Sequence, residues 1–166
     1  MLSCMLIRAA TATDWPAIWL ILRQIGESGE TLTWEPGTTE ARARSSWMRE
    51  SPGRTVVAVD DEGTVIGSAN IHPNHAGRGA HVANAGFVVD PARRGSGAGR
   101  ALCGHLLDQA RADGYRAMQF NAVVATNTPA IRLWQSFGFE ILATVPEAFL
   151  HPVHGYVGLH IMHKRL

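Results

Sequence analysis

The segment FVVDPARRGSGAGR, residues 87–100, contains the most informative pattern in the chain. Its apolar start predicts a strand, which ends before Pro91 because proline cannot donate to a ladder of strand hydrogen bonds. Gly95, Gly97 and Gly99 follow closely and predict a tight turn into a helix. Backbone N–H groups at the start of a helix have no partner inside it, so this turn can bind an anion, aided by the helix dipole.

The residues after the glycines limit which anion this turn can bind. A Walker-type phosphate loop needs a lysine and a hydroxyl residue after its last glycine, but Arg100 and Ala101 follow Gly99. A dinucleotide-binding turn needs a third glycine three residues after the second, where Arg100 or Leu102 stands. Both kinds of site are therefore excluded, and a structural turn without a ligand stays open as the alternative.

Hydrophobic periodicity on both sides of this segment predicts a mixed α/β fold. Strands are expected over residues 5–9, 55–59, 64–71, 82–89, 118–124, 140–145 and 156–162. Helices are expected from residue 14 to the glycines at 26 and 29, over 40–50 and 97–113, and from 128 to 138. Four helices distributed among about seven strands give the α/β class, and we interpret residues 1–166 as one domain.

The composition narrows the class of protein. Hydrophobic residues make up 46% of the chain and charged residues 17%, which is enough apolar material for a core. A net charge of +1 favours neither nucleic acid nor an anionic membrane as the main partner. The sequence shows no signal peptide and no stretch of membrane-spanning length. Because Cys4 and Cys103 look unpaired, we expect a soluble protein in a reducing cytoplasm.

Two motifs in this order resemble those of a known family. The first is Arg94-x-x-Gly97-x-Gly99, and the second runs from Asn127 to Phe139 as NTPAIRLWQSFGF. Together they resemble the signature of the GNAT superfamily of acetyl-CoA-dependent N-acetyltransferases. The resemblance implies a central, mostly antiparallel seven-stranded sheet flanked by about four helices, in which the fourth and fifth strands splay apart.

The resemblance also implies where acetyl-CoA would bind. The fourth strand would pair with the pantetheine arm through its backbone, and the turn after it would hold the pyrophosphate. A backbone N–H near Phe87 or Val88 would polarise the thioester carbonyl, as an oxyanion hole does. The residues assigned to the cofactor in this way are Phe87, Val88, Val89, Arg94, Gly95, Ser96, Gly97, Ala98, Gly99, Arg100, Asn127, Ala130 and Trp134.

Trp134 departs from the family pattern. Many family members have a tyrosine at this position, which is proposed to protonate the departing thiolate. Tryptophan is a hydrogen-bond donor without a usable acid proton, so it is expected to pack in the core. The thiolate would then leave unprotonated, or water, Ser136 or Tyr156 would supply the proton.

The acceptor side resembles acetyltransferases that act on proline analogues and other small amino compounds. In those proteins, asparagines on the two splayed strands contact the substrate, and Asn84 and Asn121 match their positions. We therefore assign both asparagines to substrate binding and catalysis. Trp34 and His154 lie in segments expected beside the acceptor pocket, and both are assigned to the substrate.

A base must remove a proton from the amine before it attacks the thioester. The candidates are Glu35, Glu147, His72 and His81. Glu35 is our catalytic assignment, since its loop usually covers the acceptor pocket in this fold. A metal is not expected, because the nearest histidine pairs lack cysteine partners and residues three apart on a strand face opposite sides.

The hypothesis is therefore an enzyme that moves an acetyl group from acetyl-CoA to a small-molecule amine by direct attack in a ternary complex. Two alternatives stay open. The first is a CoA-sensing module without catalysis, and the second is acetylation of proteins or peptides. A homodimer is common in the superfamily, and a C-terminal strand could mediate it.

Overall fold

The computed structural model describes residues 5–166, so Cys4 lies outside the described residues. The strands are β1 (Leu6–Ala9), β2 (Arg54–Val59), β3 (Val65–Pro73), β4 (Val82–Val89), β5 (Ala117–Val124), β6 (Glu140–His151) and β7 (Gly155–Arg165). The helices are α1 (Trp15–Ser28), α2 (Glu40–Trp47), α3 (Ala98–Ala112) and α4 (Thr128–Ser136). Three short 3-10 turns complete the fold: η1 (Ala12–Asp14), η2 (Gly77–Gly79) and η3 (Pro91–Arg93).

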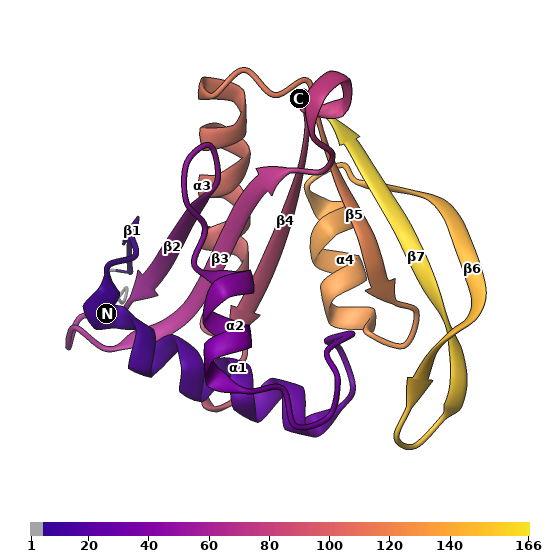
Figure 1. Ribbon diagram of the computed structural model, residues 1–166, viewed down its shortest axis with the longest axis horizontal. Helices are drawn as coiled ribbons and strands as arrows, with labels where there is room; N and C mark the ends of the chain where they lie inside the picture. Colours follow the sequence, from indigo (N-terminus) through magenta and orange to yellow (C-terminus); the bar gives the residue numbers. More distant parts are fainter. Residues whose placement is uncertain (1–4) are drawn as a thin grey trace.

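All seven strands join one sheet in the order β1-β2-β3-β4-β5-β7-β6. Every neighbouring pair is antiparallel except β4 and β5, which run parallel. The pairing of β4 with β5 is limited to Val82 with Ala117 and Ala83 with Met118. Beyond these residues the two strands diverge (Figure 1), which confirms the expected fold class and the splayed fourth and fifth strands.

Helices cover the two faces of the sheet differently. On one face, α1 and α2 pack on buried residues of β2 and β4, with Ile18, Leu22, Trp47, Val57 and Val88 in this core. On the other face, α3 and α4 lie behind the strands in Figure 1. Their apolar stripes pack on the opposite sides of the same strands to form the larger core. Because neighbouring strand residues point to opposite faces, each strand supplies both cores.

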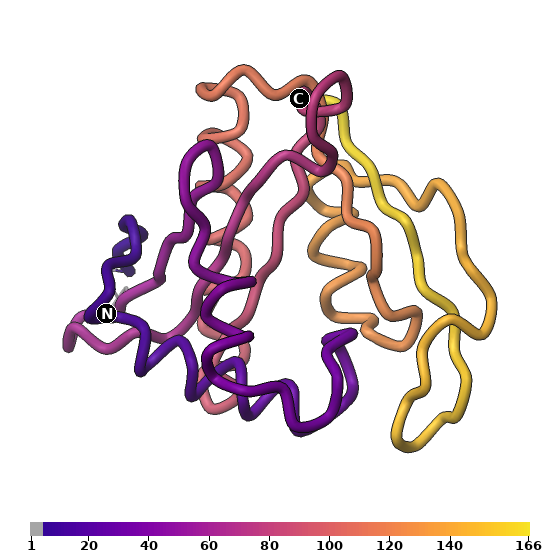
Figure 2. Tube along the Cα trace, viewed as in Figure 1, coloured from indigo at the N-terminus to yellow at the C-terminus, as the bar shows by residue number. Residues whose placement is uncertain are grey.

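The β6–β7 hairpin is longer than the sequence analysis expected. The predicted strand covers only residues 140–145, but β6 continues to His151. The ladder accommodates Pro146 in an irregular stretch between Val145 and Phe149, where Glu147 has a positive φ of 51°. Proline is tolerated because β6 is the edge strand of the sheet (Figure 2), where its missing N–H breaks no ladder bond.

Helix α2 ends at Trp47, three residues before the predicted end at Glu50. The side chain of Thr55 explains the early end. Its hydroxyl donates to the carbonyl oxygen of Trp47 and accepts from the backbone N–H of Arg49, each over 2.9 Å. These bonds tie the segment after Trp47 to the start of β2, and a longer helix would break them.

The sequence also predicts a helix cap at Thr13 or Asp14 and a core position for Cys103 on an apolar helical face. Asp14 precedes α1 but makes no capping bond to it; its carboxylate accepts from Thr11 and is paired with Arg8. The Arg8 guanidinium holds the pKa of this carboxyl well below its usual range. Cys103 is fully buried on α3, and burial raises the pKa of its thiol to about 12, which confirms its place in the core.

Candidate active site

A cavity of about 1050 Å³ opens where β4 and β5 diverge. It is walled by β4, by the turn into α3, by β5 and by the first turns of α4. The end of α1 and the segment after it form a further wall. All thirteen residues that the resemblance assigned to the cofactor line this one cavity, together with Asn84 and Asn121. Its volume is that of a site for a large ligand.

The turn between β4 and α3 presents unused backbone donors to this cavity. Inside the turn, Arg93 donates to Asp90 and Ser96 donates to Arg93. Within the described part of the chain, five backbone N–H groups of the turn have no protein acceptor. They belong to Arg94, Gly95, Gly97, Gly99 and Arg100. Free donors at a helix N-terminus form an anion-binding site, because the helix dipole places partial positive charge there.

Glycine is required at the three positions of the turn by different structural constraints. Gly95 and Gly97 have φ values of 80° and 86°, a backbone region that side chains disfavour. A Cβ atom at either position would meet nothing within 4 Å, so space is not their constraint. At Gly99 a Cβ would lie 3.3 Å from Leu133, so this glycine lets α3 and α4 approach closely. The first two glycines shape the turn, and the third positions the helices.

Trp134 is a wall of the cavity and a member of the core. Its side chain is 8% exposed and packs among aromatic rings, with ring centres 4.7 Å from Phe87 and 5.1 Å from Phe120. This packing confirms the expected core role. The two alternative acids lie elsewhere: within residues 5–166, neither Ser136 nor Tyr156 lines the cavity. Ser136 instead donates to a carbonyl of its own helix.

The two asparagines occupy opposite walls near the point where the strands separate. Asn84 is the first residue of β4 beyond its pairing with β5 and is half-buried, and its amide has no hydrogen-bond partner in residues 5–166. Asn121 is exposed, donates to Asn74 over 2.8 Å and accepts from Gln119 over 2.9 Å. Asn84 is thus free to bind a ligand, whereas Asn121 is held in place and keeps one donor and one lone pair.

A bulge in β5 aims Asn121 and its neighbour toward the cavity. The register with β7 shifts between Phe120 and Val123, so Asn121 and Ala122 together oppose one residue of β7. Bulges of this kind redirect side chains beside functional sites. Neither the bulge nor the bond from Asn121 to Asn74 could be read from local sequence, because both depend on distant strands.

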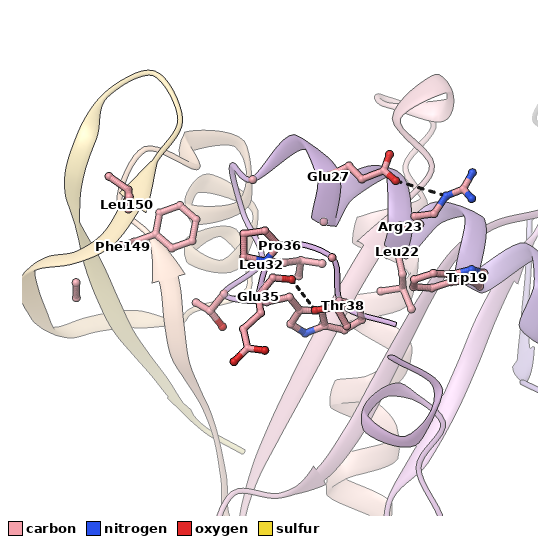
Figure 3. Close-up of a pocket in the computed structure, with 16 residues that line it drawn as sticks. Trp19, Leu22, Arg23, Glu27, Leu32, Glu35, Pro36, Thr38, Phe149 and Leu150 are labelled. Carbon is pink, nitrogen blue, oxygen red and sulfur yellow. Dashed lines mark hydrogen bonds and ion pairs between the residues drawn. The ribbon is translucent and has the colours of Figure 1, made fainter. Parts of the chain in front are cut away.

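Glu35 and Trp34 line a different cavity. This second cavity has a volume of about 660 Å³ and lies between α1, the α1–α2 loop and the end of β6. Figure 3 shows the ring of Phe149 of β6 facing the loop, with Leu22 and Trp19 of α1 beyond it. The carboxylate of Glu35 is exposed and pairs with Arg42 over 2.6 Å. The structure therefore does not bring Glu35 together with the two asparagines.

His151, rather than His154, lines the main cavity. His154 is exposed on the turn between β6 and β7. Its ring stacks on His151 with centres 4.6 Å apart. His151 is 7% exposed, and its Nδ1 accepts the backbone N–H groups of Val153 and His154. The neutral ring must therefore carry its proton on Nε2. The substrate assignment named His154, but at the turn after β6 it is His151 whose side chain reaches the main cavity.

The comparisons with known proteins agree with this geometry. The model of the acetyltransferase (GNAT) family matches residues 17–139. This chain belongs to the GNAT family of acetyltransferases. N-acetyltransferase aca1 of Schizosaccharomyces pombe is 35% identical over 112 residues, which are 67% of this chain and 54% of aca1. The chain thus spans about half the length of that relative.

A relative from Pseudomonas aeruginosa is matched over more of its length. It is the L-methionine sulfoximine/L-methionine sulfone acetyltransferase, 32% identical over 148 residues, which are 85% of this chain and 83% of the relative. Solved GNAT structures are also similar. A GCN5-related N-acetyltransferase from Kribbella flavida is 56% identical with a TM-score of 0.95, and 98% of each chain is covered.

The acetyltransferase yncA of Salmonella typhimurium was solved with its cofactor acetyl-CoA. It has a TM-score of 0.84 and 25% identity, over 99% of this chain and 95% of that one. In residues 5–166 of the present chain, no cluster of three or more histidine, cysteine or acidic side chains could hold a metal ion. None of the described helices is long and apolar enough to cross a membrane.

Proposed function

We propose that this GNAT protein transfers an acetyl group from acetyl-CoA to the amine of a small molecule. The observation that carries this proposal is the set of free backbone donors between Arg94 and Arg100, at the mouth of a cavity between two splayed strands. A diphosphate on these donors would leave the pantetheine arm running along the unpaired edge of β4. The thioester would then lie near Asn84, where β4 and β5 begin to diverge.

Each part of the site has a role in this proposal. The unpaired edge of β4 offers backbone N–H and C=O groups to the amides of the pantetheine arm. An N–H near Phe87 or Val88 would stabilise the negative charge that develops on the thioester oxygen. The amine nitrogen would attack the carbonyl carbon, a C–N bond would form, the C–S bond would break, and CoA would leave as the thiolate. Phe87, Phe120 and Trp134 contact one another and give the cavity an apolar wall.

The polar side chains where β4 and β5 begin to diverge favour a small acceptor amine. Asn84 and Asn121 present neutral amides there, Asn121 being held by a hydrogen bond from Gln119, and such amides can orient an amine without a strong charge preference. The Pseudomonas aeruginosa relative acts on an amino-acid analogue according to its name, and we infer an acceptor of similar size. Direct attack in a ternary complex follows from the shared cavity, because the described residues supply no evident nucleophile between donor and acceptor.

A screen of amines with release of the CoA thiol as readout tests the proposed function. Amino acids and their analogues are the first panel, and short peptides with a free N-terminus are the second. Turnover of the first panel is expected. Tight acetyl-CoA binding without turnover of either panel would favour the sensing module, and turnover of the peptides alone would favour peptide acetylation.

Replacing Asn84 with alanine is expected to reduce turnover more than cofactor affinity. Asn84 lines the cavity and has a free amide, so its loss removes a contact to the acceptor and leaves the turn at Gly97 intact. We expect kcat/KM for the best amine to fall by about tenfold or more, the cost of one hydrogen bond, with acetyl-CoA affinity changed less than about threefold. Steady-state kinetics and calorimetry measure both, and unchanged kcat/KM would remove Asn84 from the mechanism.

A homodimer through the C-terminal hairpin is part of the proposal. β6 is an edge strand whose apolar residues Leu142, Val145 and Leu150 are 58%, 45% and 63% exposed. Exposed edges with apolar side chains are normally covered, and a second copy would cover both. Sedimentation equilibrium is expected to give twice the mass of one chain, and a monomer at micromolar concentration would contradict this.

We also propose a cytoplasmic location, since Cys103 is a free, buried thiol and free thiols are common in that reducing compartment.

A further inference from the structure

None of the four base candidates, Glu35, Glu147, His72 and His81, lines the main cavity itself. Glu35 lies on the second cavity and is paired with Arg42. Glu147 lies in the irregular stretch of β6, the edge strand that β5 and β7 separate from β4. His81 is exposed before β4. The remaining candidate of the four is His72, at the end of β3.

His72 is the cross-strand partner of Asn84. The antiparallel register pairs these two residues directly, so their side chains lie on the same face of the sheet. The Cβ atoms of such a pair are about 5 Å apart. Asn84 is also the first residue of β4 beyond its pairing with β5, and it lines the main cavity. His72 thus lies directly beside the residue of β4 at which β4 and β5 begin to separate.

The tautomer of His72 is set by its own backbone. Its Nδ1 lies 2.8 Å from the carbonyl oxygen of Pro73. A carbonyl oxygen can only accept, so Nδ1 carries the proton and Nε2 keeps its lone pair. A neutral imidazole with one nitrogen held as donor and the other free is the form that a general base needs.

The surroundings of His72 keep it neutral. Burial lowers the pKa of His72, the bond to Pro73 opposes this, and the positive charge of Arg49 lowers it further. Arg49 lies after α2, and its Nε is buried without a hydrogen-bond partner in the described residues. From β4, the group opposite His72 is the uncharged amide of Asn84. The ring is therefore unprotonated at neutral pH and available to accept a proton.

We propose that Nε2 of His72 accepts the proton of the acceptor ammonium, through a water molecule beside Asn84. This inference rests on the proposed function and identifies its base. The proton passes from the ammonium to the water while the water passes one of its own to Nε2, so no hydroxide accumulates. The nitrogen lone pair that is set free then forms the C–N bond, and the imidazolium returns its proton to solvent after CoA leaves.

The pH dependence of a His72→Gln variant tests this proposal. The wild-type kcat/KM is expected to fall as the pH drops through the pKa of His72, which burial and Arg49 place below the usual histidine value, because protonated His72 cannot act as a base. The His72→Gln variant lacks the base, so it can use only acceptor molecules that are already unprotonated. Their fraction is small at pH 7 and rises with pH. Its kcat/KM is expected to be about 100-fold below wild type at pH 7, and this deficit should shrink to less than about tenfold near the pKa of the amine.

Controls separate this role from a structural one. His81→Gln makes the same chemical change at an exposed histidine before β4 and should leave the profile unchanged. Imidazole should partly restore a His72→Ala variant, and acetyl-CoA affinity should match wild type in every variant. A deficit that is equal at all pH values, or no deficit, would overturn the proposal. Nitrogen NMR gives a check that needs no turnover: a wild-type His72 with its proton on Nε2 would also overturn it.

These outcomes can be told apart from failure of the proposed function. If wild-type protein binds acetyl-CoA but acetylates no amine, the proposed function fails whatever the variants do. If wild-type protein acetylates amines and the His72→Gln profile is parallel to it, only the role of His72 fails.

Discussion

Gly97→Glu is expected to abolish measurable binding of acetyl-CoA. The substitution places a carboxylate among the free N–H groups that would hold the diphosphate, so two anions would compete for the same donors. It also places a side chain on a residue with a φ of 86°. We expect calorimetry to show a loss of affinity of at least about 100-fold, which corresponds to roughly 2.7 kcal/mol.

The fold should survive this substitution. A Cβ at Gly97 meets nothing within 4 Å, so the cost is that of the backbone conformation, about 1–2 kcal/mol. Gly114→Glu is the matched control, because Gly114 has a φ of 83° and equally open surroundings at the far end of α3. This control should lose similar stability and keep its cofactor affinity. Unchanged affinity in Gly97→Glu would refute our placement of the phosphate site.

Trp134→Ala is expected to have the largest effect on stability. The indole is 8% exposed and packs against Phe87 and Phe120 in the aromatic cluster between β4, β5 and α4. Truncating a buried tryptophan costs about 3–5 kcal/mol, and we expect about 3 kcal/mol here because the ring borders a cavity. Urea unfolding with an unchanged m-value measures this difference in the free energy of unfolding.

Trp134→Phe tests whether an aromatic ring at this position is enough to keep the core packed. Phenylalanine keeps a ring in the cluster, so a loss of less than about 1.5 kcal/mol is expected. If Trp134→Ala lowered the free energy of unfolding by less than about 1 kcal/mol, the packing of Trp134 would not stabilise the core as we infer.

The features that could be predicted from sequence are those encoded in short segments. The turn at residues 87–100 was predictable because glycine and proline restrict the backbone locally. The stripe of α3 was predictable from its apolar spacing, and the cap of α4 rests on Asn127, which accepts from the N–H of Ala130 as a helix start requires. These segments also define the cavity, which is why the cofactor assignments converge on one place.

The acceptor side could not be predicted in the same way, because it is assembled from distant strands. Glu35 lies on a loop whose position is set by packing against α1 and β6, and the sequence contains no signal for that packing. The bond between Asn121 and Asn74 joins residues 47 positions apart. The pairing of His72 with Asn84 depends on the register of β3 and β4, which a shift of one residue would invert.

A crystal structure of the protein with acetyl-CoA bound would test the phosphate site and the position of the thioester together. We expect diphosphate oxygens within about 3.2 Å of the backbone nitrogens of Gly95, Gly97 and Gly99, and a thioester carbon between β4 and β5 beside Asn84. A diphosphate bound elsewhere, with these nitrogens bonded only to solvent, would contradict this expectation.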